Sequence, residues 1–145
     1  MKTYIFDIDG TIANTEHRQH YLASSPKDWK GWHDNSQKDT PHWEITEILD
    51  MAREKGIKIV LCTGRDEKCR DETIEWFVMH GIHFDALYMR KAGDRRDDDI
   101  VKRELLTQIR SVGYDPVCVF EDRARVVKMW REEGLRCLQV APGEF

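Results

Sequence analysis

Three things are scarce or missing in this sequence of 145 residues: cysteine, long apolar segments and an excess of basic charge. The four cysteines lack the spacing of a metal-binding motif and three lie in apolar runs, so we expect buried free thiols in a reducing compartment. No apolar run approaches the ~20 residues of a membrane-spanning helix. Carboxylates interrupt the opening segment MKTYIFDIDG before the apolar region of a signal peptide forms. These absences predict a cytoplasmic protein.

The charge balance is acidic, with 23 basic and 27 acidic side chains and a net charge of −4. This excludes a highly basic coat for duplex DNA, because such binding depends on neutralising many phosphates. The acidic balance is compatible with binding a single phosphate or the end of a nucleic acid. A GxxxxGK[ST] phosphate-binding loop is also missing, and the length leaves no space for a kinase domain, so any 5′-kinase activity is expected from another chain.

Short apolar runs rich in β-branched residues alternate with stretches of helical period, and each helical stretch runs into a glycine that suits the position after a helix end. The alternation predicts an α/β fold: a five-stranded parallel sheet with helices on both faces, in one domain spanning residues 1–145. Residues 11–41 break this rhythm and predict a small, partly helical insert after the first strand. The predicted strands are Thr3–Phe6, Ile57–Cys62, Ala86–Met89, Val117–Phe120 and Arg136–Val140.

The first strand ends in the acidic motif Asp7-Ile8-Asp9-Gly10-Thr11. In open α/β sheets ligands bind at the carboxyl ends of the strands, which makes this motif a candidate site. Carboxylates at i and i+2 of an extended chain point the same way and repel each other unless a cation or proton intervenes. Mg²⁺ is such a cation, since it takes few carboxylates together with substrate oxygens and water. The alternative is an ordinary turn leaving the strand.

Three further strand ends carry polar residues. Thr63-Gly64-Arg65 offers a hydroxyl, a flexible glycine and a guanidinium that suit a phosphate, or else it opens the next helix. Asp98 and Lys102 stand four apart on a helix, either as a surface pair or with Asp98 orienting Lys102 toward a phosphate. Glu121-Asp122 completes a metal site with Asp7, or merely begins a helix.

All four signals fall at the carboxyl ends of consecutive predicted strands, where we expect them to converge. Their order resembles that of the haloacid dehalogenase-like (HAD) phosphotransferase superfamily. The resemblance is closer to the 3′-phosphatase domains of T-even bacteriophage polynucleotide kinase/phosphatases. It covers Ile5 to Phe145 and is densest in GDRRDDDIVKREL and EDRARVVKMWREEGLRCLQVAPGEF. It implies a HAD-like Rossmannoid three-layer fold in which the insert forms a minimal cap. It also implies that the cytoplasm in question is that of a bacterium or of a phage-infected host.

By resemblance, Asp7 is the nucleophile that forms an aspartyl-phosphate, which splits the hydrolysis into two displacements. Asp9 is implied to be the acid that protonates the leaving oxygen and the base that then activates water. Crowding by Asp7 is expected to keep Asp9 protonated near neutral pH. Thr63 and Lys102 are implied to hold the non-bridging phosphate oxygens, with Asp98 positioning Lys102.

The resemblance also implies a magnesium cofactor, which offsets the repulsion between carboxylates and phosphate. The ion is expected to bridge Asp7, the backbone carbonyl of Asp9, Asp122 and a phosphate oxygen, with Glu121 as a further metal residue. Glu121 stands where the phage domains have an aspartate. Because glutamate is longer by one methylene, direct contact with the metal and contact through water both stay open.

Several residues align with substrate-binding positions of the phage enzymes. For each arginine among them, the alternative interpretation is a solvent-exposed surface charge. A guanidinium fork on phosphate favours arginine over lysine there. The insert is longer than in the phage domains and richer in tryptophan. Trp29 and Trp32 either stack on bases or pack the insert onto the body, and packing is the preferred interpretation. The implied substrate-binding residues are Arg18, Gly64, Arg65, Arg90, Asp98 and Arg123.

The preferred hypothesis is a Mg²⁺-dependent phosphomonoesterase that removes 3′-phosphates from DNA or RNA ends in nucleic-acid repair, with a separate kinase or ligase as pathway partner. The alternative is the same chemistry on free nucleotides or another small phosphate ester, which the acidic net charge and the lack of a basic stripe favour. A non-catalytic binding module is disfavoured because a competent residue fills every catalytic position.

Overall fold

A computed structural model describes residues 1–145 and contains a central sheet of five parallel strands. The strand order across the sheet is β5-β4-β1-β6-β7, so β1 lies in the middle. All five predicted strands are present, and the predicted α/β class is confirmed. The strands are β1 (Lys2–Phe6), β4 (Lys58–Asp66), β5 (Ala86–Arg90), β6 (Asp115–Glu121) and β7 (Arg136–Gln139).

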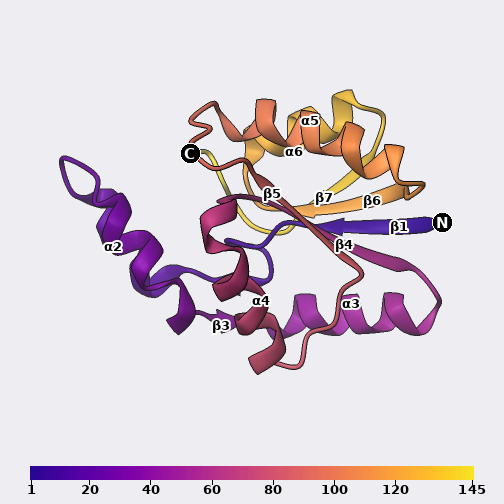
Figure 1. The fold of residues 1–145 in the computed structure, drawn as a ribbon, viewed down its shortest axis with the longest axis horizontal. Coiled ribbons are helices and arrows are strands. Elements are labelled where there is room, and N and C mark those ends of the chain that lie inside the picture. The colour runs from indigo at the N-terminus through magenta and orange to yellow at the C-terminus, as the bar shows by residue number, and fades with distance from the viewer.

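Helices cover both faces of this sheet, as Figure 1 shows. On one face lie α3 (Trp43–Glu54) and α4 (Arg70–Met79), the latter preceded by the 3₁₀ turn η3 (Glu67–Cys69). On the other lie α5 (Asp98–Ser111) and α6 (Ala124–Glu132). The glycine after each of these helices has a positive φ, as the sequence predicted, because the left-handed conformation that ends a helix suits glycine. These glycines are Gly56, Gly81, Gly113 and Gly134.

The core consists of two apolar clusters, one on each side of the sheet. Neighbouring residues of β1 serve both: Phe6 packs with α3 and α4, and Ile5 packs with α5 and α6. Successive side chains of a strand point to opposite faces, so a central strand covered on both faces is apolar at neighbouring positions, as at Ile5 and Phe6. The ring of Phe6 stacks on that of Phe120 in β6, with centroids 4.4 Å apart. The central strands are thereby fixed in register beneath their polar ends.

The insert after β1 is closed at its base by two short antiparallel strands, β2 (Ala13–Asn14) and β3 (Thr40–Pro41). Its remaining elements are helical turns, as predicted, and Figure 1 shows α2 reaching outward beyond the edge of the sheet at which β1 ends. The insert therefore stands beside the strand ends that carry the candidate site. The helical elements are η1 (Glu16–Arg18), α1 (His20–Ala23), α2 (Trp29–Asp34) and η2 (Ser36–Lys38).

The cysteines match the expectation of free thiols. None of the four forms a disulfide; Cys62, Cys118 and Cys137 are buried and Cys69 is partly buried. None of the helices is both long and apolar enough to span a lipid bilayer.

We expect Phe77→Ala to lower the free energy of unfolding by ~3–5 kcal/mol, because the side chain is fully buried against α3 and the sheet and its removal leaves a cavity. The neighbouring Val78, 72% exposed on the same helix, is the control, and Val78→Ala should change stability by less than about 0.5 kcal/mol. Urea unfolding followed by circular dichroism measures both. Similar effects of the two substitutions would contradict this packing.

Candidate active site

The carboxyl ends of β1 and β6 bring three carboxylates together. The backbone N–H of Asp7 donates to the carbonyl of Phe120 at 3.0 Å, which continues the β1–β6 ladder by one residue and sets Asp7 beside the acidic pair that follows β6. Oxygens of Asp7, Glu121 and Asp122 lie within 4.8 Å of one another, and all three residues are buried. The predicted convergence of the first and fourth strand ends is therefore present.

A single ammonium group stands among these carboxylates. Lys102 of α5 is 1% exposed, and its Nζ donates to Asp7 Oδ1 at 2.7 Å and to Glu121 Oε1 at 2.8 Å. Burial lowers the pKa of Lys102, but the carboxylates of Asp7 and Glu121 outweigh burial and raise the pKa above its usual value. The lysine is therefore charged, and it holds the nucleophile candidate in place.

One ammonium does not balance three buried carboxylates. Burial, together with the charge of Glu121, raises the pKa of Asp7 well above its usual range. Burial likewise raises the pKa of Asp122 to about 6. Such shifts arise where carboxylates crowd without enough positive charge. A cluster of hard oxygen donors with surplus negative charge fits a divalent cation such as Mg²⁺.

Gly10 explains why the motif after β1 needs glycine. Its φ is +84°, and a Cβ atom there would lie 2.1 Å from Asp122 Oδ2, far inside van der Waals contact. Only glycine permits both this backbone conformation and this approach. The loop that carries Asp7 and Asp9 is thereby pressed against the second acidic strand end.

Glu121, the departure from the phage pattern, is bound by protein donors on both oxygens. Oε1 accepts from Lys102 and, at 3.4 Å, from the indole N–H of Trp130. Oε2 accepts from the backbone N–H groups of Asp122 at 3.2 Å and Arg123 at 3.3 Å. The longer side chain is thus anchored in the protein, and it also belongs to the three-carboxylate cluster.

Thr63 and Gly64 lie near the carboxyl end of β4. Thr63 is buried, and its Oγ1 accepts from the backbone N–H of Arg65 at 3.1 Å, which leaves the hydroxyl hydrogen to donate to a ligand. A Cβ atom on Gly64 would lie 2.5 Å from Asp98 Oδ1, so glycine lets the start of α5 approach β4. This is the close approach that brings Lys102 to the strand ends.

Asp9 does not behave as the sequence predicted. Its carboxylate accepts from Arg18 Nη2 at 2.7 Å, from Arg65 Nε at 3.0 Å and from Arg65 Nη2 at 2.6 Å. Burial raises the pKa of Asp9, but the two guanidiniums outweigh burial and hold the pKa below its usual range. The expectation that Asp7 keeps Asp9 protonated is therefore wrong for this state. The Asp9 carboxylate is ionised, and it lies outside the cluster of Asp7, Glu121 and Asp122.

Behind Asp9 lies a buried carboxylate that the sequence analysis missed. Asp39 accepts from Arg18 Nε at 2.9 Å and from Arg18 Nη2 at 2.7 Å, and His17 Nε2 lies 2.6 Å from the same carboxylate. Arg65 comes within 3.8 Å of it. Asp39 thereby holds the guanidinium that binds Asp9. It lies in a loop before the two-residue strand β3, where no strand end or helical period marks it.

The two insert tryptophans differ in their packing. Trp32 is 9% exposed, lies 4.0 Å from the Arg18 guanidinium and accepts a hydrogen bond from Arg18 through its carbonyl at 3.1 Å. The preferred interpretation, packing, is right for Trp32. It is wrong for Trp29, which is 53% exposed.

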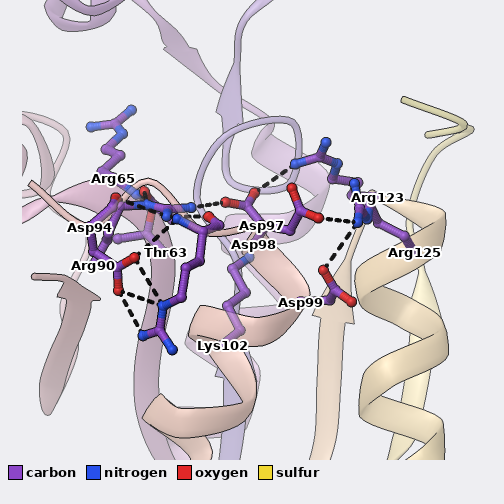
Figure 2. A network of polar contacts seen from close by, with 12 residues as sticks. Thr63, Arg65, Arg90, Asp94, Asp97, Asp98, Asp99, Lys102, Arg123 and Arg125 are labelled. Atoms are coloured by element: carbon purple, nitrogen blue, oxygen red, sulfur yellow. Dashed lines mark hydrogen bonds and ion pairs between the residues drawn. The ribbon is translucent and has the colours of Figure 1, made fainter.

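A second network, drawn in Figure 2, surrounds Asp98 at the start of α5. Asp98 accepts from Arg90 through one oxygen and from Arg123 Nη1 at 2.9 Å through the other. The predicted Asp98–Lys102 ion pair is not formed, because Lys102 reaches into the core toward Asp7 and Glu121 while Asp98 faces the two arginines.

Arg90 and Arg123, both predicted to bind substrate, donate hydrogen bonds to groups of the protein itself. Arg90 donates from Nε to the carbonyl of Gly64 at 2.7 Å and from Nη1 to the carbonyls of Asp94 and Arg96 at 3.1 and 2.5 Å. It therefore joins the ends of β4 and β5 to the charged loop before α5. The Arg123 guanidinium also donates to the carbonyl of Phe145 at 2.8 Å.

The whole chain, residues 1–145, matches the family model described as the polynucleotide kinase PNKP phosphatase domain. A putative bifunctional polynucleotide kinase/RNA ligase of Autographa californica nuclear polyhedrosis virus is 28% identical over 132 residues, which are 90% of this chain and 18% of that protein.

Among solved structures, a chain of the Pnkp1/Rnl/Hen1 RNA repair complex is 33% identical with a TM-score of 0.85, covering 99% of this chain and 43% of that one. The chain therefore spans less than half the length of these relatives. A putative beta-phosphoglucomutase from Thermotoga maritima, 17% identical with a TM-score of 0.66, shares the fold. The match covers 96% of this chain and 85% of that protein.

We expect Asp39→Ala to lower the free energy of unfolding by ~3–5 kcal/mol, because it leaves the buried Arg18 guanidinium short of its main partner. Asp34→Ala removes the exposed pair with Lys30 and should cost less than about 0.5 kcal/mol. Denaturant titration of both variants gives the comparison. If the two aspartates proved equally dispensable, the buried network would not stabilise the insert.

Proposed function

The chain belongs to the family of polynucleotide kinase PNKP phosphatase domains, and from that membership and the site geometry we propose that it removes 3′-phosphates from nucleic-acid ends. The observation that carries the proposal is the buried cluster at the strand ends. There the Asp7 carboxylate lies against Lys102 and within 4.8 Å of the oxygens of Glu121 and Asp122. A phosphate bound at this edge meets a nucleophile, an ammonium and a hydroxyl together.

In the proposed reaction an oxygen of Asp7 attacks phosphorus, and the bond to the 3′-oxygen of the strand breaks. Water then attacks the aspartyl-phosphate and releases inorganic phosphate. Lys102 holds Asp7 Oδ1 at 2.7 Å and Thr11 donates to Oδ2 at 3.1 Å, so the carboxylate is oriented before substrate arrives. Lys102 and the free hydroxyl hydrogen of Thr63 stabilise the non-bridging oxygens.

Asp9 is the proposed acid and base. Its ionised form suits the second step, in which a base takes a proton from the attacking water. In the first step Asp9 must be protonated, so that it can transfer this proton to the leaving oxygen. Protonation of Asp9 requires that Arg18 and Arg65 give up their hydrogen bonds to its carboxylate. An incoming phosphate offers both guanidiniums a competing anion, so the two arginines serve as substrate ligands in this proposal.

Asp7 and Asp122 are the proposed direct magnesium ligands, together with the backbone carbonyl of Asp9. The protein donors on both oxygens of Glu121 support an indirect role, in which it orients Lys102 and the backbone of Asp122. When bound, Mg²⁺ neutralises the carboxylates and the phosphate and so lets them approach. Asp98, Arg90 and Arg123 position the start of α5, rather than touching the phosphate.

Nucleic-acid ends are the proposed substrate because the relatives are named for polynucleotide kinase and RNA repair. The viral relative combines kinase and RNA ligase in its name, so we propose that kinase and ligase activities act on the same ends. The second candidate is a small phosphate ester. The net charge of −4 favours it, since long-strand binding normally uses a basic surface.

A substrate panel separates these candidates. With Mg²⁺ we expect phosphate release from 3′-phosphorylated DNA or RNA and none from a 5′-phosphorylated strand, with mononucleotides slower. Asp7→Asn should lower turnover by on the order of 10⁴-fold or more, because it removes the nucleophile. Asp50→Asn, on the exposed side of α3, should leave turnover unchanged. Rapid cleavage of mononucleotides with the strands untouched would instead support the small-ester candidate.

The binding of Mg²⁺ tests the cation site without relying on turnover. We expect Mg²⁺ to raise the melting temperature of the wild type, because binding to the folded state alone stabilises it. Asp122→Asn should weaken Mg²⁺ binding about tenfold or more, measured by calorimetry and by the melting shift. Asp97→Asn, an exposed aspartate near the start of α5, is the control. An equal Mg²⁺ response in all three proteins would place the ion elsewhere.

A further inference from the structure

Trp29 presents a large aromatic surface to solvent. It begins α2, the outward-reaching helix of the insert, and 53% of it is exposed. Trp32, one turn further along, is buried against Arg18, so the insert already has the aromatic side chain that attaches it to the body. Packing therefore gives no account of Trp29, and an exposed indole loses the free energy that burial would provide.

The surroundings of Trp29 are those of a stacking surface. The Lys27 ammonium lies 5.6 Å from the indole centroid, within the range of a cation–π contact. The His33 imidazole also stacks on the indole, with centroids 6.4 Å apart and planes inclined by 28°. Lys27 and His33 are both exposed, so solvent reaches a row formed by a cation, an indole and an imidazole.

The helix that carries Trp29 and His33 contacts the candidate active site. The C-terminal end of α2 leads through η2 to β3 at the base of the insert. Trp32, in the same helix, accepts a hydrogen bond from Arg18 Nη1 through its carbonyl at 3.1 Å. Arg18 in turn donates to the Asp9 carboxylate at 2.7 Å. Helix α2 therefore lies against one of the two proposed phosphate ligands, and through it next to the proposed acid.

We propose that Trp29, flanked by Lys27 and His33, is a stacking platform for the nucleobases next to the terminal 3′-phosphate of a single strand. The inference rests on the proposed function, since the phosphate at Asp7 fixes one end of the strand. Aromatic stacking accepts every base because each has a π-face, and a nearby lysine neutralises a phosphodiester. A platform for a few bases also fits a protein of net charge −4, which has no basic stripe for a long strand.

The test compares a 3′-phosphorylated oligonucleotide with the same strand made abasic at its last two nucleotides. For the strand with bases, Trp29→Ala should raise KM roughly 5- to 100-fold with kcat little changed, because the platform acts on binding. For the abasic strand the same variant should change neither constant. Trp29→Phe should restore most of the affinity, since it keeps an aromatic face.

The chain offers a matched control in Trp43, which is 58% exposed at the start of α3. Trp43→Ala should leave both constants unchanged on both strands. An equal change in KM for abasic and base-bearing strands, or no change in either, would overturn the platform while leaving the 3′-phosphatase proposal standing.

A binding measurement keeps the two proposals separable. Fluorescence anisotropy with a labelled 3′-phosphorylated strand and the Asp7→Asn protein reports affinity without turnover. Trp29→Ala added to Asp7→Asn should weaken the binding of the base-bearing strand by the same factor as KM. If the wild type releases no 3′-phosphate, the proposed function fails, and this titration still decides the platform: loss of binding on Trp29→Ala supports it and unchanged binding refutes it.

Discussion

The buried ammonium of Lys102 is the contact on which the site depends. A charge buried to this degree is tolerated only when it is paired and hydrogen-bonded, and Lys102 meets this condition by binding Asp7 after β1 and Glu121 at the end of β6. One side chain thereby fastens α5 to two strands. The same contact orients the proposed nucleophile and leaves the surplus of carboxylates that favours a divalent cation.

Much of this arrangement follows from the sequence because a parallel sheet sets all its carboxyl ends along one edge. Apolar runs locate the strands, and the residue after each run is then placed without knowing any contact, as for Asp7, Thr63 and Glu121. The partners of charged side chains do not follow in this way. They depend on distances between segments far apart in the chain, so the predicted Asp98–Lys102 pair and the predicted protonation of Asp9 were wrong.

At the candidate site the insert and the sheet meet through arginines, while Ile12 and Ala13 at the base of the insert pack in the apolar core. Arg18 reaches from η1 to Asp9 at the strand end and is held by Asp39 and by the ring of Trp32. Arg65 binds the same Asp9 from β4. The acid candidate is therefore shared by the insert and the body, and an anion arriving between them competes with Asp9 for both guanidiniums. Nothing in the local sequence around Asp39 indicates this shared network.

The two-strand base of the insert has an evolutionary consequence. β2 and β3 hold the ends of the inserted segment side by side, and Arg18 and Asp39, which lie between them, tie the segment to Asp9. The entropy of closing a loop grows slowly with its length, so residues added or lost in the outer part between Arg18 and Asp39 alter folding stability little. Descendants of such a scaffold that keep this arginine and this aspartate are free to exchange the outer segment and acquire new specificities while the reaction chemistry stays unaltered.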